Sequence, residues 1–274
     1  MSNINRIKDC FLVLKNKKKS ALIAFITAGD PDLITSLKML NALPEAGVDI
    51  IELGMPFSDP MADGPVIQRS YLRALKEGNS LDKTLNLVRQ FRKKNKKTPI
   101  ILMGYYNPIL QMGIKAFFKK ARSCGVDGIL IVDFPPDANN ELDRETEEGG
   151  LDIIRLVTPT TNKDRLKSIL KSSSGFLYYV SITGITGTKI SKLEDIKEKY
   201  LNLKEFINLP FVIGFGINTP KKAKAMCSYS DGVVVGSDII KNIEKSIKNN
   251  SNILNNVINL VKKYNRAVKS AKKL

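Results

Sequence analysis

A glutamate interrupts one of the most apolar runs of this 274-residue chain, and two aspartates follow it in a loop rich in proline and glycine. The segment reads DIIELGMPFSDPMADGP over residues 49–65, with Glu52 inside the apolar run and Asp59 and Asp63 behind it. Burial disfavours the charged form of a carboxyl group and moves its pKa toward the range of a general acid or base. Glu52 is therefore a candidate for proton transfer. A salt bridge between Glu52 and a nearby lysine is the structural alternative, and Asp63 also suits a turn or a helix cap.

The histidine and cysteine content limits which residues can carry out catalysis. The chain has no histidine, which excludes triads of the usual kind, His-ligated metals and imidazole acid–base catalysis. Its three cysteines, Cys10, Cys124 and Cys227, are scattered and form no C-x-x-C pair, so we expect buried free thiols rather than a disulfide framework or a zinc site. Proton transfer must then fall to Asp, Glu, Lys, Tyr or Cys.

Three glycine-bearing segments lie near the C-terminal end of the chain: TGITG over residues 183–187, GFGI over 214–217 and VGSD over 235–238. Without a Cβ atom, the backbone N–H groups of such a segment can approach an anion closely, and together the three predict a phosphate site. Each glycine alone also suits an ordinary tight turn. None of the segments matches the P-loop or the dinucleotide fingerprint, which favours a phosphorylated metabolite over a nucleotide.

These residues require a fold that brings them together. Near-continuously apolar runs, as expected of strands buried on both faces of a parallel sheet, occur at residues 21–27, 49–54, 99–104, 128–133, 152–158, 176–182, 211–216 and 232–237. A strand and a helix repeated about eight times predict an α/β fold, a (β/α)8 TIM barrel with extra N-terminal and loop helices. We expect one domain over residues 1–274. An open doubly wound sheet is the alternative, because periodicity alone does not show closure.

Helix signals fill the gaps between these runs. We expect a helix over about residues 66–76, another after the cap Ser80, and a third with Thr219 as its cap and Pro220 at its first position. A closing amphipathic helix carries apolar residues from Ile253 to Val268 on one stripe. In such a barrel the reactive residues lie at the C-terminal ends of the strands and in the loops that follow. The carboxylates and the glycine segments both fall there.

The chain carries a formal net charge of +17, which raises the question of nucleic-acid binding. The basic residues are spread over surface-type segments such as RKKNKK, without aromatic interleaving or a recognisable nucleic-acid motif. A solvated lysine-rich surface is therefore the favoured interpretation, and its field suits an anionic small substrate. No apolar run approaches the roughly 20 residues of a membrane-spanning helix. We expect a cytoplasmic protein.

Along nearly the whole chain, these motifs resemble the α subunit family of tryptophan synthase. The resemblance rests on AFITAGDP, IIELGMPFSDPMADGPVIQ, LMGYYNPI, GVDGILIVDFPP, SITGITG, GFGI and DGVVVGSDII, in this order. It implies a lyase that cleaves indole-3-glycerol phosphate to indole and glyceraldehyde 3-phosphate. Glu52 matches the principal acid–base residue of the family. Asp63 matches the second catalytic carboxylate, which is thought to bind the indole N–H.

The same resemblance assigns the rest of the site. The positions implied to bind phosphate are Gly184, Gly187, Phe215, Gly216, Gly236 and Ser237, and those implied to contact the indole or support the carboxylates are Phe25, Tyr105, Asp133, Tyr178 and Thr186. Arg69 and Ser70 depart from the family pattern, which has smaller or amide side chains after VIQ. The segments MPFSDPMADGP and TGITGTK correspond to mobile lids of the family.

The resemblance further implies a partner protein and no cofactor in this chain. It implies an α2β2 complex in which a β subunit carries pyridoxal phosphate (PLP) and consumes the indole, with no cofactor or metal in this chain. Two alternatives remain at this point. One is a sister phosphate-binding barrel, such as a sugar-phosphate isomerase or epimerase, and the other is a basic nucleic-acid-binding barrel without catalysis.

Overall fold

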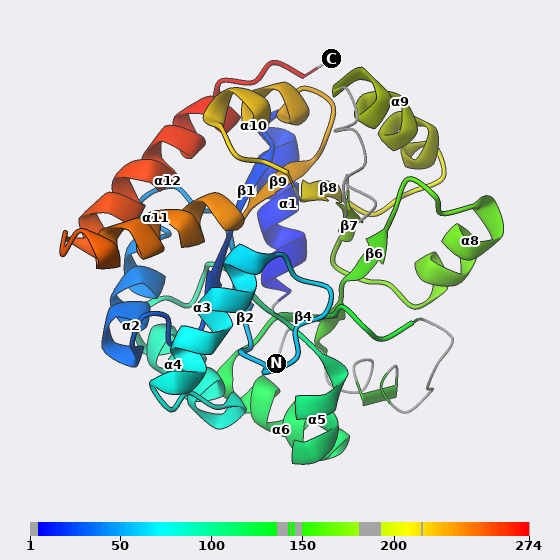
Figure 1. Cartoon of the computed structure of the whole chain (residues 1–274). Coiled ribbons are helices and arrows are strands. Elements are labelled where there is room, and N and C mark those ends of the chain that lie inside the picture. The colour runs from blue at the N-terminus through cyan, green and yellow to red at the C-terminus, as the bar shows by residue number, and fades with distance from the viewer. Residues whose placement is uncertain are drawn as a thin grey trace.

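The computed structural model describes residues 5–135, 142, 144–145, 150–180, 193–214 and 216–273. A parallel sheet stands at its centre, with the strand order β5-β4-β3-β2-β1-β9-β8-β7-β6. Helices surround the sheet (Figure 1). The strands are β1 (Ala21–Thr27), β2 (Ile50–Gly54), β3 (Ile100–Gly104), β4 (Gly128–Ile131), β5 (Asp152–Ile153), β6 (Arg155–Val157), β7 (Leu177–Val180), β8 (Phe211–Gly214) and β9 (Gly232–Val235).

The sheet closes through one continuous segment, residues 152–157. Its first part, β5, pairs with β4 at Gly128 and Asp152, and its second part, β6, pairs with β7 at Leu156 and Tyr178. A single residue, Ile154, separates β5 from β6, and its N–H still donates to the carbonyl of Ile129 at 2.9 Å. The two ends of the strand order are thus joined. The predicted barrel is confirmed, with its fifth strand divided in two, and the open doubly wound sheet is excluded.

The helices of the described residues are α1 (Arg6–Asn16), α2 (Leu33–Ala42), α3 (Pro65–Lys76), α4 (Leu81–Lys94), α5 (Tyr106–Met112), α6 (Ile114–Cys124), α8 (Lys163–Lys171), α9 (Leu193–Lys204), α10 (Pro220–Cys227), α11 (Ser237–Lys248) and α12 (Ile253–Lys269). The predicted caps are confirmed. Ser80 accepts a hydrogen bond from the N–H of Lys83 at 3.3 Å, and Thr219 accepts one from the N–H of Lys222 at 3.2 Å. The final helix buries Val257, a residue of the predicted stripe.

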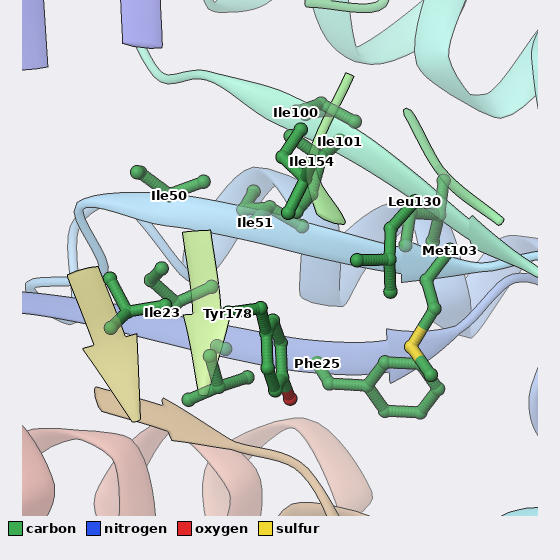
Figure 2. Close-up of a cluster of buried hydrophobic side chains, with 14 of the residues drawn as sticks. Ile23, Phe25, Ile50, Ile51, Ile100, Ile101, Met103, Leu130, Ile154 and Tyr178 are labelled. Carbon is green, nitrogen blue, oxygen red and sulfur yellow. The ribbon is translucent and has the colours of Figure 1, made fainter. Parts of the chain in front are cut away.

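Large apolar side chains fill the interior of the barrel. Figure 2 shows Ile23 and Phe25 of β1, Met103 of β3 and Tyr178 of β7 among them. The Tyr178 ring needs the space left by a glycine on the next strand, because a Cβ on Gly214 would lie 2.1 Å from Cε1 of Tyr178. The close fit fixes the Tyr178 ring inside the barrel, toward the C-terminal ends of the strands.

Helix α1 lies across the N-terminal ends of the strands. The ring of Phe11 packs against that of Phe176, just before β7, with centroids 5.6 Å apart. The fully buried Ile7 reaches the first residue of β4, since a Cβ on Gly128 would lie 3.1 Å from its Cδ1. Cys10 of the same helix donates its S–H to the carbonyl of Asp49, just before β2, at 3.6 Å. One helix thus covers the starts of three strands, and it passes through the middle of the ring in Figure 1.

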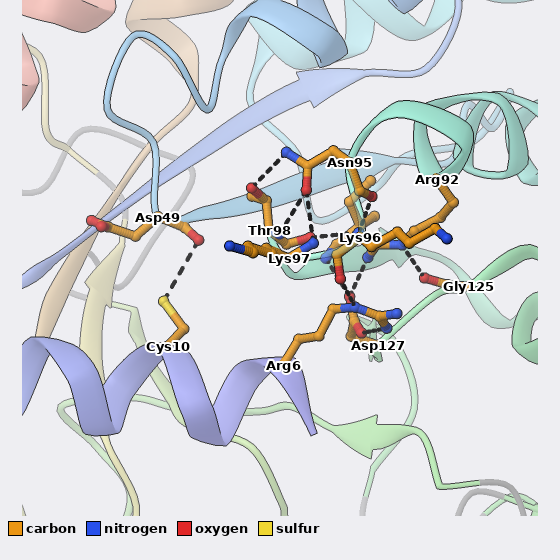
Figure 3. Close-up of polar contacts among 11 residues, drawn as sticks. Arg6, Cys10, Asp49, Arg92, Asn95, Lys96, Lys97, Thr98, Gly125 and Asp127 are labelled. Carbon is orange, nitrogen blue, oxygen red and sulfur yellow. Dashed lines mark hydrogen bonds and ion pairs between the residues drawn. The ribbon is translucent and has the colours of Figure 1, made fainter. Parts of the chain in front are cut away.

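A buried aspartate, Asp127, joins several elements at this end of the barrel (Figure 3). Its carboxylate accepts hydrogen bonds from Arg6 at 2.7 Å, from Arg92 at 2.5 Å and from the N–H of Ile100 at 2.7 Å. Arg92 also donates to the carbonyl of Gly125 at 2.7 Å. Burial lowers the pKa of Arg92 to about 10, still well above neutrality, so the Arg92 guanidinium is charged at neutral pH.

Replacing Asp127 with asparagine should destabilise the fold by about 2 kcal/mol, because two arginines lose a buried counter-charge. Urea unfolding of the variant and the unchanged chain measures the difference. The control is Asp82→Asn, which breaks an exposed ion pair with Lys120. That change should cost less than about 0.5 kcal/mol. Equal losses for the two variants would show that Asp127 has no special structural role.

Two further expectations concern the state of the cysteines and the presence of membrane-spanning helices. Cys124 and Cys227 are buried free thiols as expected, whereas Cys10 is free but half-buried, because it lies at the edge of α1 facing Asp49. Among the described residues, none of the helices combines the length and the apolar character needed to cross a membrane.

Candidate active site

A cavity of about 300 Å³ opens at the C-terminal ends of the strands. The side chains of Phe25, Met103 and Tyr178 form its apolar inner wall. These three lie together inside the barrel in Figure 2. Glu52 and Asp63 stand in the same wall. The cavity therefore brings both carboxylates of the opening motif against an aromatic surface.

Glu52 points into the barrel, where it stands in register with Phe25 of β1. Its side chain is 1% exposed, and Oε1 has no hydrogen-bond partner among the described residues. Burial, together with the nearby charge of Asp63, raises the pKa of Glu52 to about 8. The group is thus mainly protonated near neutral pH and has a proton to give. Within the described chain Glu52 forms no ion pair, so the salt-bridge alternative finds no support.

Asp63 reaches the cavity from the loop between β2 and α3. The hydroxyl of Tyr105, at the end of β3, donates to Oδ2 of Asp63 at 2.7 Å and accepts from the N–H of Ala62 at 3.1 Å. The side chain of Gln68 donates to the carbonyl of Asp63 at 2.9 Å. Burial raises the pKa of Asp63 to about 6, and the Tyr105 hydrogen bond limits the rise.

The two carboxyl groups consequently differ in protonation. Between the pKa of Asp63, about 6, and that of Glu52, about 8, Asp63 is mainly ionised while Glu52 is mainly protonated. Two carboxyl groups whose environments separate their pKa values can divide acid–base work from electrostatic stabilisation. At neutral pH the cavity therefore combines a proton donor with a fixed negative charge.

Part of the cavity lining lies at the N-terminus of a helix, a setting that favours an anion. Gly236 precedes α11, Ser237 is the first residue of that helix, and both line the cavity. The N–H groups and the dipole at a helix N-terminus favour negative charge. A Cβ on Gly236 would lie 3.2 Å from Cβ of Phe25, so a larger residue would require Phe25 to shift. Gly216 lines the same side and has a φ of +71°, which also favours glycine.

The other predicted site residues have different places. Tyr105 supports Asp63 by its hydrogen bond. Asp133 follows β4, and its carboxylate accepts from the N–H of Tyr106, the first residue of α5, at 2.9 Å. It lines another cavity, of about 590 Å³, rather than this one. Asp59 is exposed and accepts from the hydroxyl of Ser58. Four predicted residues lie outside the described ones: Gly184, Thr186, Gly187 and Phe215.

Two polar residues of the cavity were not predicted. Lys241 of α11 and Asn218, in the loop after β8, both line it. A signal for Lys241 exists in the sequence, because it follows Ser237 by four residues and so lies one helical turn along the same face. It was obscured by the many other lysines of the chain. Asn218 has no comparable signal.

The two departures from the family pattern anchor α3. Arg69 donates from Nε and Nη2 to the two carboxylate oxygens of Glu244 on α11, at 2.8 and 2.9 Å. The hydroxyl of Ser70 lies 2.6 Å from that of Thr27, at the end of β1. Helix α3 follows directly after the loop with Asp63, so these contacts tie the helix behind that loop to α11 and to β1.

A closed barrel of parallel strands, with its cavity at their C-terminal ends, defines the class of (β/α)8-barrel enzymes. Within that class the sequence profile of the tryptophan synthase alpha chain matches residues 11–269. The chain belongs to the tryptophan synthase alpha chain family.

Solved structures agree with this assignment. The tryptophan synthase alpha chain from Legionella pneumophila subsp. pneumophila has 39% sequence identity and a TM-score of 0.91, and the match covers 97% of each chain. A chain from Aquifex aeolicus VF5 has 36% identity and a TM-score of 0.88, over 97% of this chain and 100% of the other. Tryptophan synthase from M. tuberculosis, in an aminoacrylate-bound form, has 29% identity and a TM-score of 0.85, over 97% and 100%. These findings support the predicted family and not the sister-barrel alternative.

Proposed function

We propose that this chain cleaves indole-3-glycerol phosphate to indole and glyceraldehyde 3-phosphate. The observation that carries the proposal is the pairing of Glu52 and Asp63 in one cavity that also contains the N-terminus of α11. The distribution of groups suits this substrate. The aromatic wall of Phe25 and Tyr178 suits the indole, and the glycine-lined end suits the phosphate.

In the proposed reaction Glu52 moves the protons. Its protonated carboxyl group gives a proton to C3 of the indole, which makes the ring an electron sink. Glu52 then takes the proton of the glyceryl hydroxyl next to the breaking bond. The C–C bond opens, its electrons return to the indole ring, and glyceraldehyde 3-phosphate is formed. Glu52 ends in its starting protonation state, and a pKa of about 8 suits both transfers.

In the same scheme Asp63 holds the indole. Its carboxylate accepts the indole N–H and stabilises the positive charge that develops on the ring when C3 is protonated. The Tyr105 hydroxyl, 2.7 Å from Oδ2, orients Asp63 for this contact. The phosphate end of the substrate is then held by Gly216, Gly236 and Ser237, together with Gly184, Gly187 and Phe215 by resemblance.

The setting of the reaction belongs to the same proposal. We propose that the chain is a single domain that works in the cytoplasm, without a cofactor of its own, in an α2β2 complex. The partner β subunit would carry PLP and consume the indole. Membership of the tryptophan synthase alpha chain family supports this partnership.

The direct test is an assay of indole release from indole-3-glycerol phosphate by the purified chain, with and without a β subunit. We expect indole and glyceraldehyde 3-phosphate in equal amounts, with a higher rate in the presence of the β subunit. An absence of both products under both conditions would disprove the proposed function.

Lys241 should contribute to substrate binding at the mouth of the cavity. Replacing it with alanine should raise the KM roughly fivefold with little change in kcat, because an exposed lysine contributes about 1 kcal/mol toward a phosphate. The effect should shrink at high salt. The control is Lys245→Ala, which removes the same charge one turn further along α11, outside the cavity wall. Equal effects of the two changes would indicate a general field instead of a specific contact.

A further inference from the structure

A second tyrosine lies beside the carboxylate pair. Tyr71 of α3 is 0% exposed, and its ring covers the end of β2, since a Cβ on Gly54 would lie 3.2 Å from Cε1 of Tyr71. Gly54 follows Glu52 by two residues on the strand, so both face the barrel interior, with Cα atoms about 6.6 Å apart. Burial raises the pKa of Tyr71 well above its ordinary value, and Asp63, Tyr105 and Glu52, in that order, add to the rise.

The polar atoms of this region are complementary. Within the described chain, the Tyr71 hydroxyl has no hydrogen-bond partner, and neither has Oε1 of Glu52. A buried polar atom without a partner costs about 1–3 kcal/mol, so such atoms are rare in native proteins. Tyr71 supplies a donor and Glu52 an acceptor. Asp63 already accepts from Tyr105, which leaves Glu52 as the carboxyl group that lacks a donor.

We propose that the Tyr71 hydroxyl is the hydrogen-bond donor that positions the Glu52 carboxyl group. The terminal torsion of a glutamate is soft, so a small rotation of Glu52 can bring Oε1 toward Tyr71. One buried water can also bridge the two groups, because it would have polar partners on both sides. Either contact fixes the orientation of the carboxyl group that faces the cavity.

Other titratable or charged groups also face Glu52. They are Asp63 in the loop after β2 and Tyr178 on β7, and Lys241 of α11 lines the same cavity. Asp63 has no O–H to donate when it is ionised, Tyr178 has interactions of its own, and Lys241 is exposed at the mouth. Tyr71 is thus the buried hydroxyl best placed to serve Glu52.

The test measures the pKa of Glu52 in the substrate-free protein. Infrared spectra recorded across a pH titration follow the carboxyl band of Glu52 as it ionises. The Glu52→Gln variant identifies that band. A hydrogen bond to the carboxylate favours the charged form, so Tyr71→Phe should raise the pKa of Glu52 by about one unit. Tyr71→2,3-difluorotyrosine keeps the ring and gives a stronger donor, so it should lower the pKa of Glu52. Opposite shifts are not expected from a purely structural role.

The matched control is Tyr179→Phe. Tyr179 is also fully buried, and its hydroxyl also lacks a partner among the described residues, but its ring packs against Tyr200 and Phe211, outside the barrel interior. This variant should leave the Glu52 titration unchanged. Coinciding titrations of Tyr71→Phe, Tyr179→Phe and the unchanged chain would overturn the proposal, as would a failure of difluorotyrosine to shift the pKa downward if Tyr71→Phe does not fold.

The catalytic consequence rests on the proposed function. In the indole-release assay, Tyr71→Phe should lower kcat about tenfold with little change in KM, and should move the pH profile of kcat/KM upward by the same amount as the Glu52 titration. The infrared measurement needs no substrate. If the unchanged chain releases no indole, the proposed function fails, while the role of Tyr71 toward Glu52 is still decided by the titration.

Discussion

Replacing Glu52 with glutamine should slow indole release about 10³-fold, because glutamine keeps the shape of the side chain but can neither give nor accept the proton. The KM should change little, since the phosphate end and the aromatic wall are untouched. Steady-state release of indole from indole-3-glycerol phosphate measures the effect. The control is Glu45→Gln, the same change at an exposed position. Full activity in Glu52→Gln would disprove the role assigned to Glu52.

The same variant should be more stable than the unchanged chain at high pH. A glutamate ordinarily has a pKa of 4.5, whereas the pKa of Glu52 in the folded protein is about 8, so folding favours its protonated form. Its contribution to stability is complete below pH 4.5 and is lost as the pH rises through about 8. Glutamine stays neutral. The stability difference in urea unfolding should therefore grow between these two pH values and level off above them.

Replacing Asp63 with asparagine should slow indole release about 10²- to 10³-fold, because a neutral amide cannot stabilise the positive charge on the protonated indole. Protonated Asp63 should be inactive for the same reason, because it is also neutral. The rate of the unchanged chain should therefore fall as the pH drops through about 6, the pKa of Asp63. Steady-state kinetics across this pH range measure both effects. This fall in rate at low pH, the acid limb of the pH profile, should be absent in Asp63→Asn.

Tyr105→Phe provides the comparison for Asp63. This change keeps the Asp63 charge and removes the hydrogen bond that orients it, so the rate should fall only about tenfold. The same loss of a hydrogen bond should raise the pKa of Asp63 and move the acid limb upward. If Tyr105→Phe is as damaging as Asp63→Asn, the phenol rather than the carboxylate is the group that matters.

Much of the fold could be predicted because the strands of a closed parallel barrel are apolar on both faces. The run at residues 152–158 carried that signal, but its division into β5 and β6 at Ile154 did not appear in the sequence. The break falls where the pairing of this segment passes from β4 to β7. Such a tertiary effect leaves no mark on apolar periodicity.

The site was predictable where a residue conflicts with its surroundings. Glu52 inside an apolar strand is such a conflict, and the glycines at Gly216 and Gly236 are recognisable by their place after strands. Tyr71 shows no conflict, because an aromatic residue on the inner face of a helix looks like ordinary core. Its relation to Glu52 exists only in three dimensions. Lys241 could not be singled out either, because the sequence contains many other surface lysines.

The position of α1 has a consequence for the traffic of small molecules. This helix, with the Arg6–Asp127 contact beside it, covers the N-terminal ends of β2, β4 and β7 in the described part of the chain. Under the proposed function, substrate and both products would therefore pass through the cavity at the other end, which Asp63 and Lys241 line. A protein that receives the indole directly would then dock over the opening of that cavity, and docking there would also decide when the next substrate can enter.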